Sequence, residues 1–146
     1  KVLWWFPEHP MALRLATNVQ FPTDSARVFG LNSYGGGLST NGTVKVRPTF
    51  NIDFGYEYSI TQKWVFAIDF VYTLSGKTTF TGIPGFDEFG DSYAIGGPAS
   101  DNFSLSPAIE YNVTDTGGFI GGVWFSVTGR NSSSYVAGLL SYTQLF

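Results

Sequence analysis

The sequence predicts an all-β fold: an antiparallel, up-and-down transmembrane β-barrel to which this chain contributes about seven strands. Three observations lead to this prediction. Apolar and polar residues alternate with a period of two along much of the chain, whereas helical periodicity is hard to find. Short connections alternate with long ones. Aromatic residues make up 18% of the chain and charged residues only 13%, yet no apolar run approaches the roughly 18 residues of a membrane helix.

Each expected strand has one apolar and one polar face, because successive side chains of a strand point to opposite sides. The first segment, "VLWWF", is a short apolar run, and the second carries Leu13, Leu15 and Phe21 on one face. The third, "VKVRPTFNIDFGYEY", is the most regular, with apolar even positions from Val44 to Tyr58. The expected strands cover residues 2–6, 12–21, 44–58, 63–82, 102–113, 118–130 and 133–146.

The last four segments repeat this pattern. The fourth alternates "WVFAIDFVYTL", and the fifth sets Phe103, Leu105 and Ile109 against Ser104 and Ser106. The sixth and seventh, "GGFIGGVWFSVTGR" and "SSYVAGLLSYTQLF", are richer in glycine and serine but keep apolar residues two apart. Alternation alone does not tell whether the apolar faces meet a protein core or lipid.

The lengths of the connections favour lipid. Residues 7–10, 59–62 and 114–117 are short turns, whereas 22–42 and 83–101 are long, polar and rich in glycine. Short turns at one rim and long loops at the other are typical of membrane barrels, with turns in the periplasm and loops outside. The last connection, "RNSS", is tight where a long loop would be expected.

Aromatic side chains gather next to the short turns. The hairpins "YEYSITQKWVFAIDF" and "IEYNVTDTGGFIGGVWF" each place an outward tyrosine before the turn and an aromatic residue after it. Such a row is expected of an aromatic girdle at the headgroup region. The predicted lipid-facing and girdle residues are Phe50, Phe54, Tyr56, Tyr58, Trp64, Phe66, Phe70, Tyr111, Phe119, Tyr142 and Phe146.

The C-terminal segment "VAGLLSYTQLF" resembles the closing strand of Gram-negative outer membrane β-barrels, although Gln144 and Gly138 depart from its usual apolar pattern. The resemblance implies integral placement in the bacterial outer membrane, with lipid, lipopolysaccharide and the barrel assembly machinery as partners. More narrowly, "LSPAIEYNV" and "GGVWFSVTGR" resemble transporters of the phenol-degradation (MetA-pathway) type. That resemblance implies uptake of small aromatic or hydrophobic molecules.

The strand count bears on domain organisation. Residues 1–146 are expected to form a single β-barrel domain. Single-chain bacterial barrels have an even number of strands and both termini in the periplasm, so seven strands predict at least one further strand before Lys1. We therefore expect the C-terminal portion of a larger barrel.

The polar faces are the best functional candidates. If the apolar faces meet lipid, the lumen-lining residues are Arg14, Lys45, Arg47, Asn51, Asp53, Glu57, Asp69, Glu110 and Arg130. Opposed charges across a constriction would select solutes by charge, whereas mutual pairing of the same charges would plug a narrow barrel. The sequence leaves these two alternatives equal.

Three functions follow. The first is a porin-like channel or transporter for passive uptake of small molecules. The second is a barrel that serves structure or surface interaction through its long external loops. The third, from another class, is a soluble secreted β-sandwich that binds carbohydrate through exposed aromatic residues.

Catalytic and cofactor chemistry is not expected. His9 is the one histidine and cysteine is absent, so a metal site or a catalytic triad lacks its usual residues. The acidic segment "FDEFGD" (86–91) favours a solvated loop over a calcium site. The net charge of -3 gives no basic surface for nucleic acid. The chain is therefore expected to be neither an enzyme nor a cofactor, metal or nucleic-acid binder.

Overall fold

The computed structural model describes residues 1–144, and all regular structure within them is β-strand. The strands form a seven-stranded and a three-stranded sheet, with antiparallel pairing. The chain divides into two compact units. Unit 1 comprises Lys1–Asn18, Asn51–Thr73 and Asp101–Phe146, and unit 2 comprises Val19–Phe50 and Leu74–Ser100. The predicted all-β, antiparallel class is confirmed.

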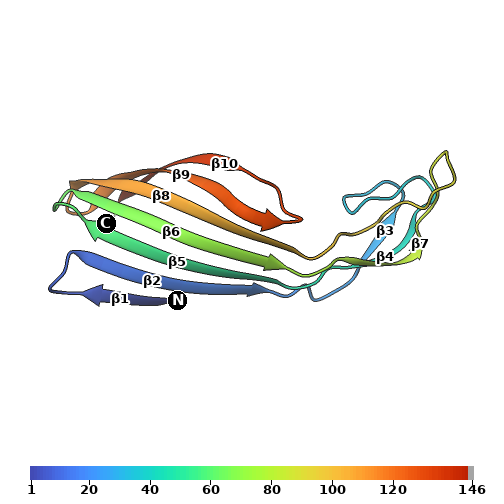
Figure 1. Ribbon diagram of the computed structural model, residues 1–146, viewed down its shortest axis with the longest axis horizontal. Coiled ribbons are helices and arrows are strands. Elements are labelled where there is room, and N and C mark those ends of the chain that lie inside the picture. The colour runs from blue at the N-terminus through green and yellow to red at the C-terminus, as the bar shows by residue number, and fades with distance from the viewer. Residues whose placement is uncertain (145–146) are drawn as a thin grey trace. The chain divides into compact units, whose positions relative to one another are not determined.

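The seven-stranded sheet has the up-and-down order that the sequence predicts. Its strands lie in the order β1-β2-β5-β6-β8-β9-β10, so each strand pairs with the next strand of this same sheet along the chain (Figure 1). They are β1 (Val2–Phe6), β2 (Met11–Gln20), β5 (Thr49–Ser59), β6 (Trp64–Ser75), β8 (Ser100–Thr114), β9 (Gly117–Arg130) and β10 (Val136–Gln144).

Threonines hold two of the short turns between these strands. The Thr61 hydroxyl accepts the backbone N–H groups of Lys63 and Trp64 at 3.2 and 3.0 Å, which closes the β5–β6 turn. Thr114 does the same at the β8–β9 turn, where it accepts the Thr116 N–H at 3.3 Å. A hydroxyl that bonds to the backbone two or three residues ahead competes with the strand ladder and favours a turn. At the third turn, residues 7–10, the His9 N–H donates to the Phe6 carbonyl at 3.0 Å, so the three predicted short turns are confirmed.

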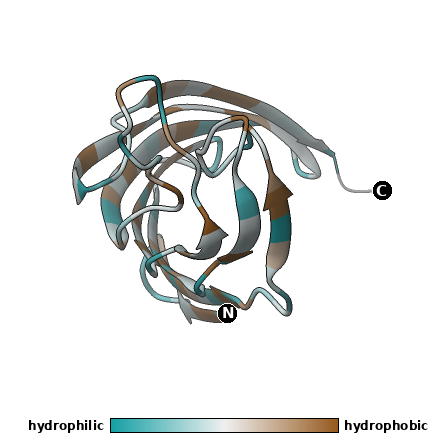
Figure 2. Cartoon of the chain, turned by 90° about the vertical axis from the view of Figure 1, so that its right-hand side faces the viewer, coloured by the Kyte–Doolittle hydropathy of each residue, from teal (hydrophilic) through white to brown (hydrophobic). Residues whose placement is uncertain are grey.

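The sheet curves, and hydrophilic and hydrophobic residues alternate along its strands (Figure 2). Within the described residues, β1 and β10 lie at the two edges and do not pair with each other. The closed barrel that the sequence predicts is thus not seen in this chain, which forms an open curved sheet.

The strands and loops of unit 2 differ from those that the sequence predicts. Its sheet has the order β3-β4-β7, built from β3 (Ala26–Phe29), β4 (Asn41–Lys45) and β7 (Thr79–Ile83). The prediction of continuous strands over 44–58 and 63–82 is wrong, because residues 46–48 and 76–78 interrupt them. The prediction that 22–42 and 83–101 are wholly loops is also wrong.

The interruption at residues 46–48 has a physical cause. Pro48 has no N–H to give to a ladder, and its carbonyl accepts the Gly76 N–H at 3.1 Å across the two breaks. Before the break, Val44 is 0% exposed and belongs to the interior of unit 2. The apolar stripe expected from Val44 to Tyr58 therefore divides between two units.

Thr40 organises the polar segments of unit 2. Its side chain is 3% exposed, and its hydroxyl accepts the Gly37 N–H at 2.8 Å and donates to the Pro84 carbonyl at 2.6 Å. Gly36 has a φ of 102°, and a Cβ there would come within 2.6 Å of the same hydroxyl. The glycine-rich composition that predicted a loop thus serves a tight, hydrogen-bonded turn.

We expect Thr40→Val to loosen unit 2. The substitution keeps the shape of the side chain but leaves the buried Gly37 N–H and the partly buried Pro84 carbonyl unpaired, and each loss costs up to about 1–3 kcal/mol. Amide hydrogen exchange at Gly37 and proteolysis within 22–42 should both accelerate. Thr43→Val, at an exposed position of β4, is the matched control and should change neither rate. Equal rates for the two variants would contradict the role of Thr40.

Candidate functional site

The polar face of the seven-stranded sheet carries the strongest side-chain interactions of unit 1. On β5 and β6, the Thr73 hydroxyl donates to Asn51 Oδ1 at 2.7 Å. Further along the same face, Arg14 of β2 donates through Nη2 to Asp69 Oδ1 at 2.5 Å. Polar positions from three strands that are separate in sequence therefore meet on one side of the sheet.

Arg14, Asp53 and Asp69 form a charge cluster. Arg14 Nη2 lies 2.5 Å from Asp69 and 3.6 Å from Asp53, and the three side chains are 28–34% exposed. Arg14 Nε and Asp53 Oδ1 are shielded from solvent and have no hydrogen-bond partner among the described residues. One guanidinium thus holds two carboxylates together. Arg14 and Asp53 each keep one atom that could still form a hydrogen bond.

Gly55 leaves the space for this cluster. A Cβ at this position would lie 2.7 Å from Asp69 Oδ1 and 3.0 Å from Arg14 Nε. Any larger residue would push the guanidinium away from the carboxylates. The glycine that interrupts the charged positions of β5 is therefore part of the site.

A hollow of about 360 Å³ lies beside the charge cluster. Its wall is charged on one side and largely apolar on the other. Because β2 and β10 are separated by four strands in the sheet order and still line one hollow, the polar face is concave. The lining residues are Arg14, Glu57, Ala67, Asp69, Ser106, Ala108, Ile120, Gly122, Leu139, Leu140 and Ser141.

The other predicted lumen-lining residues lie elsewhere. Glu110 lines a smaller hollow near the β8–β9 turn. Arg130 ends β9 and pairs with Asp101 at 3.2 Å, with its side chain 72% exposed. The expectation that Lys45 and Arg47 share a strand with Asp53 is wrong, because Lys45 ends β4, Arg47 lies within the break at 46–48, and both belong to unit 2.

Aromatic residues form a row across four neighbouring strands on the opposite, apolar face. Trp64 of β6 contacts Tyr111 of β8, with ring centroids 4.6 Å apart. Tyr111 stands opposite Phe119 in the β8–β9 register, and Phe119 contacts Tyr142 of β10 at 4.8 Å. We call these four residues the aromatic row.

A second contact on the apolar face joins Phe54 and Phe70 at 6.0 Å. Together with the aromatic row, this contact places predicted outward residues of five strands on a common face. Phe146, also predicted to face lipid, lies outside the described residues.

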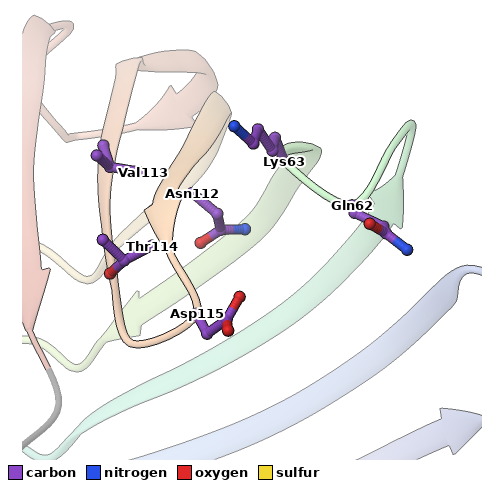
Figure 3. Close-up of a pocket in the computed structure, with 6 residues that line it drawn as sticks. All are labelled: Gln62, Lys63, Asn112, Val113, Thr114 and Asp115. Atoms are coloured by element: carbon purple, nitrogen blue, oxygen red, sulfur yellow. The ribbon is translucent and has the colours of Figure 1, made fainter.

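A polar hollow lies between two neighbouring turns. Its lining comes from Gln62 and Lys63 of the β5–β6 turn and from residues 112–115, and Figure 3 shows the Lys63 side chain extending toward the strand that carries Asn112. The Asn112 N–H donates to the Lys63 carbonyl at 2.8 Å, which ties the turns together.

The remaining sequence candidates have structural explanations. Asp87 Oδ1 accepts the N–H groups of Phe89 and Asp91 at 2.9 and 2.8 Å, so this carboxylate holds a turn. Across residues 1–144, histidine and acidic side chains do not gather in a group of three or more that could hold a metal ion. In the same part of the chain, no helix has the length and apolar character needed to cross a membrane.

Sequence reasoning missed one feature of the polar face. Trp124 of β9 donates its indole N–H to Ser104 of β8 at 3.0 Å, and its ring meets Tyr135 edge-on at 5.3 Å. The signal was present, because Trp124 occupies an even position between the outward Val123 and Phe125. An aromatic residue at a position expected to be polar indicates a specific contact on the polar face.

Comparisons with protein-family models, with curated proteins and with solved structures gave no significant match to this chain.

Proposed function

We propose that this chain belongs to a β-barrel of the Gram-negative outer membrane that admits small molecules passively, without catalytic chemistry. The proposal rests on one observation: the seven-stranded sheet is a single layer whose apolar face is open. On that face Trp64, Phe119 and Tyr142 are 46%, 48% and 54% exposed. Ala12 is the one buried hydrophobic side chain of unit 1 within residues 1–144.

A single-layer sheet of this kind needs an apolar environment. In water, a sheet buries its apolar face against a second layer, and contiguous apolar patches of this breadth are rare on soluble monomers. Within unit 1, the described residues provide no second layer, which disfavours a soluble β-sandwich built from this sheet. Lipid would cover the whole face, and the aromatic row would then lie at one headgroup region.

The concave polar face supports a solute path. Residues of six strands line the hollow beside the charge cluster, and ionisable groups at membrane depth are retained where they face water or a partner. Closure requires the edges of β1 and β10 to pair, with each other or with strands beyond this sequence. Delivery by the barrel assembly machinery and contact with lipopolysaccharide are part of the proposal.

Planar-bilayer recording tests the channel function. The full protein, purified in detergent and inserted into a bilayer, should produce discrete conductance steps. A vesicle-swelling assay with small neutral solutes should show uptake that depends on solute size. Stable insertion without conductance or swelling would contradict a channel and leave a sealed barrel.

A surface-interaction role is the second candidate, and unit 2 supplies the observation that favours it. The long segments expected to be loops form an ordered sheet, and large apolar side chains stand exposed on them, among them Leu31, Leu38 and Phe89 at 81%, 100% and 83%. An ordered surface with exposed apolar groups suits recognition of another molecule. Retention of conductance after removal of 26–44 and 79–99 would separate this role from the channel.

A further inference from the structure

Trp124 and Tyr135 line a second hollow on the polar face, separate from the charge cluster. Its volume is about 480 Å³, and its lining residues are Thr73, Asn102, Trp124, Ser132, Ser133 and Tyr135. The wall therefore combines two aromatic rings with small polar groups, and it includes no charged side chain.

Hydrogen bonds hold the Trp124 ring and the backbone of Tyr135 in place. The Trp124 indole N–H donates to Ser104, whose side chain is 1% exposed. The backbone of Tyr135 is fixed by Ser126, because the Tyr135 N–H donates to the Ser126 hydroxyl and the Ser126 N–H donates to the Tyr135 carbonyl, each at 3.0 Å. The ring planes stand at 80° to each other. The aromatic corner is thus preorganised, which lowers the entropy cost of binding.

The polar groups around the corner keep free acceptor capacity. Thr73 donates its hydroxyl proton to Asn51, so its oxygen remains available as an acceptor. Asn102 donates through Nδ2 to Ser132 at 3.4 Å, and Ser132 donates to the Asp101 carbonyl at 2.8 Å. The Asn102 side-chain carbonyl has no hydrogen-bond partner among the described residues. Several acceptors therefore surround two aromatic rings.

Lipid contact does not account for this pair. Trp124 faces the polar side with Ser104, opposite to the aromatic row, and is still 36% exposed. A tryptophan whose N–H is already satisfied offers its apolar ring face to whatever enters the hollow. A ligand that uses the whole site needs one apolar face and several hydroxyl groups along its edge.

We propose that this hollow binds a neutral sugar ring, with the apolar C–H face of a pyranose against Trp124 and its hydroxyl groups donating to Asn102, Thr73 and Ser133. This inference names a solute class for the proposed channel and rests on that function for its biological meaning. A flat phenol would stack on the same ring but would satisfy at most one of the polar groups. Charged solutes find no counter-charge in the lining.

Calorimetric titration of the full protein in detergent with maltotriose tests the proposal, with phenol as the competing probe. We expect saturable maltotriose binding that Trp124→Leu weakens about tenfold, since stacking of rings contributes on this scale. Asn102→Leu keeps both rings and should also weaken binding. Trp64→Leu removes the same residue type from the aromatic row on the opposite face and should leave binding unchanged.

Several results would overturn the proposal: no maltotriose binding to the folded protein, tighter binding of phenol than of maltotriose, or equal loss in the Trp124 and Trp64 variants. The result is independent of the channel test. Conductance without maltotriose binding removes only the sugar site, and binding without conductance removes only the channel.

Discussion

Replacement of Phe66 by arginine is expected to destabilise the protein in a lipid bilayer by about 1–2 kcal/mol, between the costs of a lipid-facing cation at the interface and at the midplane of a membrane barrel, because Phe66 lies two residues beyond Trp64 of the aromatic row. Phe66 lies between Trp64 and Phe70 on β6, and both of these residues make ring contacts on the apolar face. Its side chain must therefore point the same way. A guanidinium there would have to sit in hydrocarbon or reach for the headgroups.

Ala67→Arg is the matched control for this substitution. Ala67 is the next residue of the same strand, at nearly the same depth, and it lines the hollow beside Glu57 and Asp69. The new cation would meet water and two carboxylates, so we expect a much smaller loss of stability. Denaturant unfolding in lipid vesicles measures both free energies. Equal costs for the two variants would show that the apolar face does not meet lipid.

Alternation in the sequence was sufficient to predict the seven-stranded sheet. The period of two identifies which residues share a face, and short turns join β1 to β2, β5 to β6 and β8 to β9, so the pairing and direction of these strands follow without knowledge of distant contacts. Trp64, Tyr111, Phe119 and Tyr142 accordingly form one row across four strands. For this part of the fold, the alternation of residues and the residues of the short turns were sufficient for the prediction.

Unit 2 could not be predicted in the same way. β3 has four residues, too few for alternation to stand out within a glycine- and serine-rich segment. The long run from Val44 to Tyr58 looks continuous because the pattern keeps its phase through Pro48, although the chain leaves one sheet and enters the other there. Periodicity fixes the face of a residue but does not identify its partner strand.

The charge cluster shows the same limit within the site. Alternation placed Arg14, Asp53 and Asp69 on polar faces, but their meeting depends on the relative registers of β2, β5 and β6. Registers depend on bulges and strand ends, which short-range sequence signals specify poorly. The sequence alone therefore could not decide whether these charges select solutes across a constriction or pair with one another and plug the barrel. That choice depends on the distances between the charged groups.

Those distances lead to the second prediction. Arg14→Met should make the proposed channel more selective for cations. The cluster with Glu57 carries one positive and three negative charges, a sum of -2, and the substitution changes this sum to -3. In water, a unit charge about 7 Å from a permeating ion contributes about 0.6 kcal/mol, which favours a cation roughly threefold and disfavours an anion by the same factor.

Reversal potentials in a gradient of potassium chloride measure this change, and Asp69→Asn should move them in the opposite direction. Lys63→Met removes an equal charge at the β5–β6 turn, away from the cluster, and should shift them less. High salt should reduce all of these differences through screening. If Arg14→Met and Lys63→Met gave the same potential, the charge cluster would not face the path of the ions, and mutual pairing that plugs the concave face would be the better account of Arg14.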